Sequence, residues 1–188
     1  MGHSKAAKTT SHDRILDVAA HRFRERGFDG VGVAELMKEA GLTHGGFYKH
    51  FASRDALVAE ATTRAFESVD QRFAARTRDD SRSRLESFLD AYLAATHRDD
   101  PGDGCAIATL AIDVARHPPA RETFAAHFSE VADRVAGLLS CEKDWARGAA
   151  VICALAGAIS VARAIDDRRQ SDAILEAMHR LILAAEPG

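Results

Sequence analysis

The chain has 188 residues, of which 46% are hydrophobic and 28% are charged, as in an ordinary soluble protein with room for a sizeable core. Alanine is abundant, β-branched residues are few and no alternating strand pattern occurs, which argues against a protein built on β-sheets. The net charge of −3 argues against a molecule that binds nucleic acid through an overall basic character.

The charge is unevenly distributed along the chain. Residues 1–57 contain nine Lys and Arg against seven Asp and Glu, a net charge of +2, which leaves −5 for the rest. A cationic N-terminal part on an anionic remainder fits contact with DNA through one end only. On charge alone, a chance asymmetry explains the distribution equally well.

The three cysteines, Cys105, Cys141 and Cys153, form an odd and sparse set with no CxxC spacing. This predicts a reducing environment and no structural zinc site. The N-terminal residues lack the apolar core of a signal peptide, and the longest apolar run, residues 149–162, is shorter than the ~20 residues of a membrane span. We therefore expect a cytoplasmic protein that does not span a membrane and binds neither a metal nor another cofactor.

The first predicted helix covers residues 11–26 and ends at Gly27. Its basic last turn suits the negative end of a helix dipole. Its apolar residues form one stripe that we expect to be buried: Ile15, Leu16, Ala19, Ala20 and Phe23.

Residues 32–57 predict two short helices joined by a tight turn, followed at once by the start of a third. In residues 33–40 the apolar positions recur at offsets of 0, 3, 4 and 7, which places them on one helical face. Gly41 provides the left-handed residue of the turn, and Thr43 is expected to cap the next helix with its side chain.

In the second short helix, Phe47 and Phe51 are expected to point inward at a spacing of four. The opposite, outward face carries His44, Gly45, Tyr48 and Lys49. A short helix with a polar and cationic exposed face, fixed by a turn behind it, is the kind of element that enters a DNA major groove.

These motifs resemble the helix-turn-helix of the tetracycline-repressor (TetR) family of bacterial transcription regulators, over about residues 11–58. Two positions depart from the family pattern: Gly32 replaces a Ser or Thr cap, and Arg54 replaces a lysine. The matching segments are Gly27-Phe28, residues 33–40, Gly41-Leu42-Thr43, Tyr48-Lys49-His50-Phe51 and Ser53-Arg54-Asp55-Ala56-Leu57.

The resemblance implies an all-α protein of about nine helices. It implies a three-helix DNA-binding domain in residues 1–57 and a ligand-binding and dimerisation domain in residues 58–188. The predicted DNA contacts are Thr43, His44, Gly45, Tyr48, Lys49, His50 and Arg54. Thr43, Tyr48 and Arg54 are expected to touch phosphate, whereas His44 and Lys49 are expected to read bases.

The remainder of the chain predicts six further helices. The clearest loop is residues 97–104, rich in Asp and Gly. The first of the six begins near Ser53, and the others cover about residues 84–96, 105–117, 118–138, 144–165 and 171–185.

The expected ligand pocket lies among the helices between residues 58 and 165. Taken one at a time, its aromatic candidates are better explained as ordinary core residues. Trp145 and Tyr92 favour a pocket, since each brings a polar atom that a buried pocket must satisfy. The candidates are Phe66, Phe88, Tyr92, Cys105, Leu110, Phe124, Phe128 and Trp145. Cys105 begins a helix, a position that can activate a thiol, so a thiol sensor is an alternative to a small buried wall of the pocket.

The last two helices carry the predicted dimer interface, because the resemblance implies a four-helix contact between two subunits. The alternative for the apolar face of the last helix is the core of its own subunit. The predicted interface residues are Val151, Leu155, Gly157, Ile159, Ile174, Met178 and Leu181.

The sequence thus favours a homodimeric transcription regulator, a repressor that binds a palindromic double-stranded DNA operator and is released by a small, largely apolar inducer. One alternative is a regulator that senses thiol oxidation or electrophiles through Cys105. Another is a helical enzyme or partner-binding protein that does not bind DNA. We do not expect an enzyme, because no nucleophile, glycine-rich loop or metal spacing accompanies the polar residues.

Overall fold

The computed structural model describes residues 5–76, 83–139 and 144–186. Over these residues the regular secondary structure is entirely helical. This confirms the predicted all-α class. The elements are α1 (Lys5–Arg26), α2 (Val33–Glu39), the 3-10 helix η1 (His44–Lys49), α3 (Arg54–Arg76), α4 (Arg84–Tyr92), α5 (Ala95–Asp99), α6 (Ala106–Arg116), the 3-10 helix η2 (Pro118–Ala120), α7 (Arg121–Ala136), α8 (Trp145–Arg163) and α9 (Arg168–Ala184).

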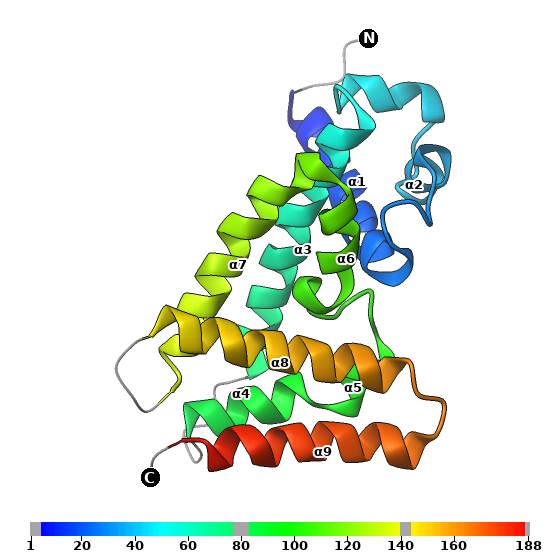
Figure 1. Cartoon of the computed structure of the whole chain (residues 1–188). Helices are drawn as coiled ribbons and strands as arrows, with labels where there is room; N and C mark the ends of the chain where they lie inside the picture. The colour runs from blue at the N-terminus through cyan, green and yellow to red at the C-terminus, as the bar shows by residue number, and fades with distance from the viewer. Residues whose placement is uncertain (1–4, 77–82, 140–143, 187–188) are drawn as a thin grey trace.

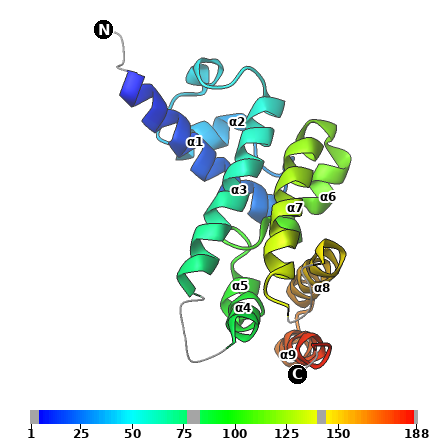
Figure 2. The same ribbon diagram turned by 90° about the vertical axis from the view of Figure 1, so that its left-hand side faces the viewer.

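The helices divide into a small N-terminal head and a larger body (Figure 1). In the head, α1, α2 and η1 surround the beginning of α3. In the body, α8 and α9 lie side by side across the end that is opposite to the head, and α7 packs along α8 (Figures 1 and 2). The long helix α3 runs from the head into the body, so it belongs to both.

Local chemistry explains where the elements begin and end. Gly27 and Gly41 end α1 and α2 with φ angles of 74° and 72°, which favour glycine. Ser83 and Glu86 form a reciprocal capping box at the start of α4. Asp144 and Asp167 accept backbone N–H groups at the starts of α8 and α9.

Two predicted boundaries are wrong. The helix expected over residues 84–96 breaks after Tyr92, and a new helix, α5, occupies part of the predicted loop. A buried histidine stabilises this break: His97 Nδ1 donates to the Tyr92 carbonyl (2.5 Å), and His97 Nε2 accepts from the Cys105 amide (2.8 Å). The side chain therefore satisfies the Tyr92 carbonyl, which a continuous helix would have paired, and the Cys105 amide at the start of α6.

The helix α8 is long and apolar enough, by length and composition alone, to cross a membrane, with a mean hydropathy of 1.6. One such helix is weak evidence, because core helices of soluble proteins have the same properties. Here 39% of α8 is buried within the chain, against α7 and α9.

Candidate nucleic-acid interface, ligand region and subunit face

The helix-turn-helix is held together by aromatic side chains on its inner face. Phe47 and Phe51 are each 2% exposed, and their rings stack with centroids 5.6 Å apart. The turn before them follows Gly41, where Leu42 N donates to the Met37 carbonyl (2.8 Å). The predicted inward direction of both phenylalanines is confirmed.

The recognition segment is a 3-10 helix and not the expected α-helix. Gly46 N donates to the Thr43 carbonyl (2.9 Å), and His50 N donates to the Phe47 carbonyl (2.9 Å), both with the three-residue spacing of a 3-10 helix. Two adjacent glycines, Gly45 and Gly46, disfavour a regular α-helix here. The predicted side-chain cap at Thr43 is wrong, since its side chain makes no capping bond.

The outer face of this segment is open to solvent. Thr43, His44, Gly45, Tyr48 and Lys49 are all exposed, and Tyr48 is 77% exposed. Among the described residues Lys49 makes no ion pair, although neighbouring cations of the head do. The exposed face therefore presents an ammonium group, a phenol and an imidazole to solvent, and no described carboxylate forms an ion pair with the ammonium group of Lys49.

His50 and Arg54 have different surroundings from the other five predicted contacts. His50 is half-buried, with its ring 6.3 Å from that of His12 on α1. Arg54 donates from Nη2 to the Phe28 and Val31 carbonyls, and the second of these bonds is 3.1 Å long. Arg54 thus holds the loop between α1 and α2, a role that sequence reasoning missed.

The predicted ligand residues fall into two groups in the structure. One is a chain of rings from α3 to α8: Phe66 contacts Phe124 (centroids 5.5 Å apart), Phe124 stacks on Phe128 (6.5 Å), and Phe128 meets Trp145 (6.3 Å). The other group is buried in the body core: Phe88, Tyr92, Cys105 and Leu110.

Trp145 does not bring an unsatisfied polar atom into a buried pocket, as the sequence suggested. Its side chain is 46% exposed, and its Nε1 donates to Ser129 Oγ (3.1 Å) on α7. The indole lies at the start of α8, on the outside of the ring chain.

A polar cluster around Tyr92 was not predicted. Tyr92 is 1% exposed, and burial, with Cys105 as the next cause, raises the pKa of its hydroxyl well above 10. Arg163 lies beside it and donates to the Arg98 carbonyl (2.9 Å) and the His97 carbonyl (2.8 Å). Burial lowers the pKa of Arg163. His97 and Arg98 were missed because they lie in a segment that resembled a loop.

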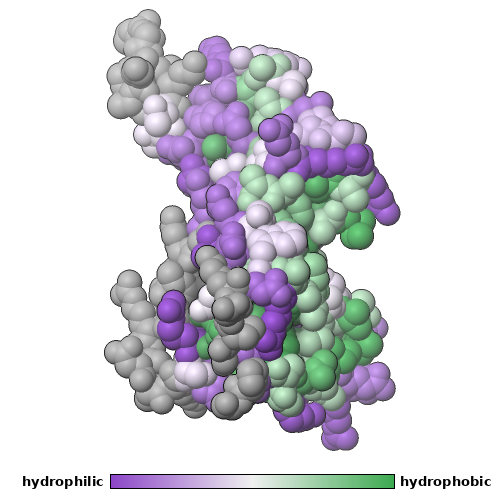
Figure 3. Space-filling view, turned by 60° about the vertical axis from the view of Figure 1, so that its left-hand side comes forward, coloured by the Kyte–Doolittle hydropathy of each residue, from purple (hydrophilic) through white to green (hydrophobic). Residues whose placement is uncertain are grey.

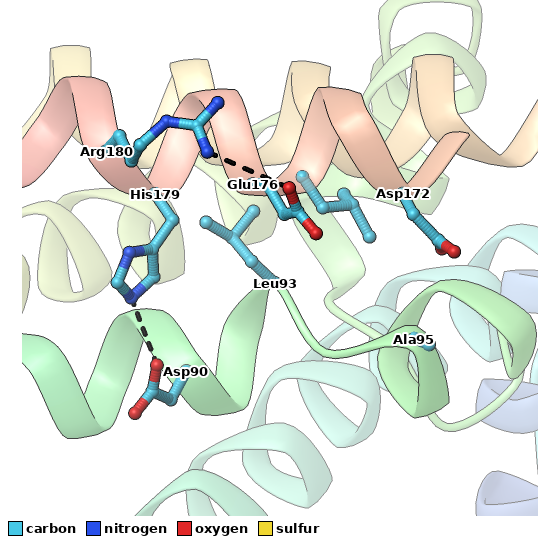
Figure 4. A pocket seen from close by; sticks show the side chains of 8 residues that line it. Asp90, Leu93, Ala95, Asp172, Glu176, His179 and Arg180 are labelled. Atoms are coloured by element: carbon cyan, nitrogen blue, oxygen red, sulfur yellow. Dashed lines mark hydrogen bonds and ion pairs between the residues drawn. The ribbon is translucent and has the colours of Figure 1, made fainter. Parts of the chain in front are cut away.

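A surface groove of about 390 Å³ lies between α4–α5 and α9, and Figure 4 shows it from close by. His179 Nε2 bonds Asp90 Oδ1 across it (3.0 Å), and Arg180 faces Glu176 (3.7 Å). None of the eight predicted ligand residues lines this groove, whose walls are Asp90, Leu93, Ala95, Asp172, Leu175, Glu176, His179 and Arg180.

The predicted dimer residues do not share one face. Leu155 and Ile159 are 0% exposed and pack into the core of their own subunit, so their assignment to the interface is wrong. Gly157 is exposed and Leu181 is 63% exposed, whereas Val151, Ile174 and Met178 are half-buried.

The outer face of α8 carries no charged residue. Its exposed positions are Trp145, Ala146, Ala150, Cys153, Gly157, Ser160 and Val161. On α9 the exposed Ala173, Ala177 and Leu181 recur every four residues. Figure 3 shows hydrophobic surface gathered where α8 and α9 lie. An exposed helix face without charged residues, such as that of α8, is typical of a protein–protein contact.

Comparison with known proteins gives three findings. Residues 15–61 match the profile of the bacterial regulatory proteins of the tetR family. The uncharacterized HTH-type transcriptional regulator YdgC of Bacillus subtilis (strain 168) is 41% identical over 59 residues, 31% of this chain and 30% of that protein. The HTH-type transcriptional repressor DhaR of Mycobacterium sp. (strain GP1) is 27% identical over 108 residues, 57% of this chain and 54% of that protein.

The likeness extends over the whole chain in three dimensions. A TetR transcriptional regulator from Chloroflexus aurantiacus J-10-FL superposes with a TM-score of 0.77 at 25% identity, covering 95% of this chain and 96% of that one. In sequence, however, the matched segments span only about a third to a half of the curated relatives.

Proposed function

Because this chain belongs to the tetR family of bacterial regulatory proteins, we propose that it is a cytoplasmic transcriptional repressor that binds a palindromic DNA operator as a homodimer. The observation that carries the proposal is the outer face of η1. Its exposed Tyr48, Lys49 and His44 stand on a segment fixed from behind by buried phenylalanines. Such a fixed, cationic face suits insertion into a major groove.

Dimerisation is supported by the uncharged outer face of α8 and the exposed stripe of α9. Two copies that pair through these helices bury Gly157 and Leu181 and place two heads on one side. A two-fold dimer of this kind matches two equivalent half-sites on DNA.

A small, largely apolar inducer is proposed to bind the body and weaken DNA binding. The ring chain from Phe66 to Phe128 supports this, since Phe124 and Phe128 are only half-buried and leave apolar surface exposed on α7. By linkage, the inducer binds the DNA-free form more tightly than the DNA-bound form, by the same factor by which it weakens DNA binding.

The test begins with duplexes selected from a random pool by the purified protein. We expect a symmetric protected site in footprinting and an affinity that falls steeply with salt, because phosphate contacts release counterions. Lys49→Ala should weaken binding and reduce the salt slope by about 1, and Tyr48→Ala should weaken binding without loss of fold.

Arg84→Ala is the matched control, because it removes one exposed cation from α4, which lies at the end of the body away from the head and outside the proposed subunit contact. It should leave operator affinity unchanged. An asymmetric footprint, or wild-type affinity in both head variants, would contradict the proposal. If the protein activates a reporter gene and does not repress it, the proposed DNA-binding site stands, but the protein is an activator and not a repressor.

A further inference from the structure

The glycines of this chain form two groups: those at which the fold leaves no room or no suitable backbone angle for a side chain, and those at which it does. Gly27 and Gly41 have positive φ angles. At several others an added Cβ would collide with the chain, as at Gly30, where it would lie 2.0 Å from the Arg26 carbonyl oxygen, and at Gly148, 2.1 Å from the Ala132 carbonyl oxygen. Replacing these glycines strains the fold, so their presence is explained from within.

Gly45 has no such internal reason. A Cβ there would meet no atom within 4 Å, counting the residues that the structure describes beyond its own helix and chain neighbours. Its φ is not in the left-handed region, and the residue is exposed. Glycine in a helical segment is nevertheless destabilising relative to alanine, since it loses more backbone entropy on folding.

The neighbouring Gly46 differs in the direction of its missing side chain. A Cβ there would lie 3.6 Å from Met37 Cε and 3.8 Å from Thr43 Oγ1, in ordinary contact with α2 and the turn. Position 46 therefore faces into the head, whereas position 45 faces outward, on the same exposed side as Tyr48 and Lys49.

We infer that Gly45 is a specificity-determining residue at which the backbone of η1 lies directly against the floor of the DNA groove, so that any side chain is excluded there. The inference rests on the proposed function and refines it by assigning the closest approach to one position. In the free protein the space beside Gly45 is open, yet a destabilising glycine leaves it empty. DNA that occupies this space in the complex explains why a side chain is absent.

The experiment compares Gly45→Ala with Gly46→Ala, two identical changes one residue apart. Affinities are measured by fluorescence anisotropy on the selected operator and on a scrambled duplex of equal length, and melting temperatures by circular dichroism. Both variants should melt at or above the wild-type temperature, because alanine restricts the unfolded chain. Gly45→Ala should lose about tenfold or more in operator affinity, as expected of one overpacked methyl group.

Gly46→Ala should bind the operator within about threefold of wild type, the range of a neutral substitution. Affinity for the scrambled duplex should stay unchanged in both, since non-specific binding does not seat the segment in the groove. The inference is overturned if Gly45→Ala binds the operator like wild type, if Gly46→Ala loses as much, if both duplexes are affected equally, or if Gly45→Ala melts lower. A wild-type protein that selects no DNA would instead refute the proposed function itself.

Discussion

At the scale of single residues, the two tyrosines of the chain occupy opposite environments. Tyr48 projects from the head into solvent, and Tyr92 is enclosed in the body. Both were singled out from the sequence as site residues, one for DNA and one for a ligand. The sequence could place them on helices, but it could not show that Tyr92 is closed in by α5 and Arg163, because α5 itself was not predicted.

Tyr92 predicts a loss of stability at alkaline pH. Its folded pKa is raised by burial, whereas in the unfolded chain it ionises near pH ~10. The free energy of unfolding should therefore be unaffected by Tyr92 below that pH and fall as the pH rises above it, because only the unfolded state releases the proton. Urea unfolding between about pH 9 and 11 measures this slope.

Tyr92→Phe should flatten the alkaline slope, and Tyr48→Phe, which removes the exposed tyrosine, should retain it. Equal slopes in the wild type and Tyr92→Phe would contradict the assignment. The comparison isolates one group, since these are the two tyrosines of the chain.

The structure also bears on the alternative of a thiol sensor. Cys105 is 5% exposed, next to Tyr92, so a reagent reaches its sulfur only when the body opens. We predict that iodoacetamide modifies Cys105 far more slowly in the native protein than in the urea-unfolded chain, as measured by mass spectrometry at pH 7.5. Fast native labelling, together with electrophile-induced loss of DNA binding that Cys105→Ser abolishes, would favour the sensor.

At the scale of elements, periodicity predicted amphipathic helices well and uniformly apolar ones poorly. In α9, charged residues mark much of the solvent side, and Leu181, which was predicted for the subunit interface, is 63% exposed in the single chain. In α8, small and apolar residues occupy every side, so the pattern could not distinguish the face toward α7 from the face toward solvent. Leu155 and Ile159 were assigned to the interface for that reason, and the structure places them in the core.

This difference predicts two separable phenotypes in α8. Leu155→Ala should lower the free energy of unfolding by about 2–5 kcal/mol, since it leaves a cavity in the subunit core. Gly157→Glu should leave the subunit folded, because its side chain projects into open space, but should prevent dimerisation by placing an unpaired charge in the contact.

Sedimentation at micromolar concentration and urea unfolding measure the two effects separately, and Leu181→Glu should behave like Gly157→Glu. Glu176→Ala, on the charged side of α9, serves as the control that stays dimeric. A protein that remains dimeric after both substitutions to Glu would place the subunit contact elsewhere.

At the scale of the whole molecule, the head is joined to the body by more than the shared helix α3. Asp103, in the loop before α6, contacts His21 of α1 (3.3 Å), and His117, after α6, contacts Asp55 of α3 (3.4 Å). Both ends of α6 thus contact the head, and the proposed boundary at residue 57 falls inside a continuous helix. None of these contacts follows a sequence pattern, because each joins residues tens of positions apart.

Arg24 makes the most buried of these connections. It is 4% exposed, and it donates to the Gly102 carbonyl in the body (2.6 Å), the Ala65 carbonyl of α3 (2.8 Å) and Ser68 Oγ (2.7 Å). Arg24→Ala removes these three hydrogen bonds and should lower the free energy of unfolding by about 2–3 kcal/mol, the value of buried bonds to a charged group.

Arg22 provides the matched control two residues earlier on the same helix. Its guanidinium bonds Glu39 and Glu25 within the head, on the surface, so Arg22→Ala should change stability much less. Because Arg24 connects the α5–α6 loop to the head, its loss should also reduce the factor by which an inducer weakens DNA binding, while Arg22→Ala keeps that factor. Equal losses of stability in the two variants would show that the buried hydrogen bonds of Arg24 stabilise the protein no more than the surface ion pairs of Arg22 do. An unchanged coupling factor in Arg24→Ala would show that the path between inducer and DNA does not pass through Arg24.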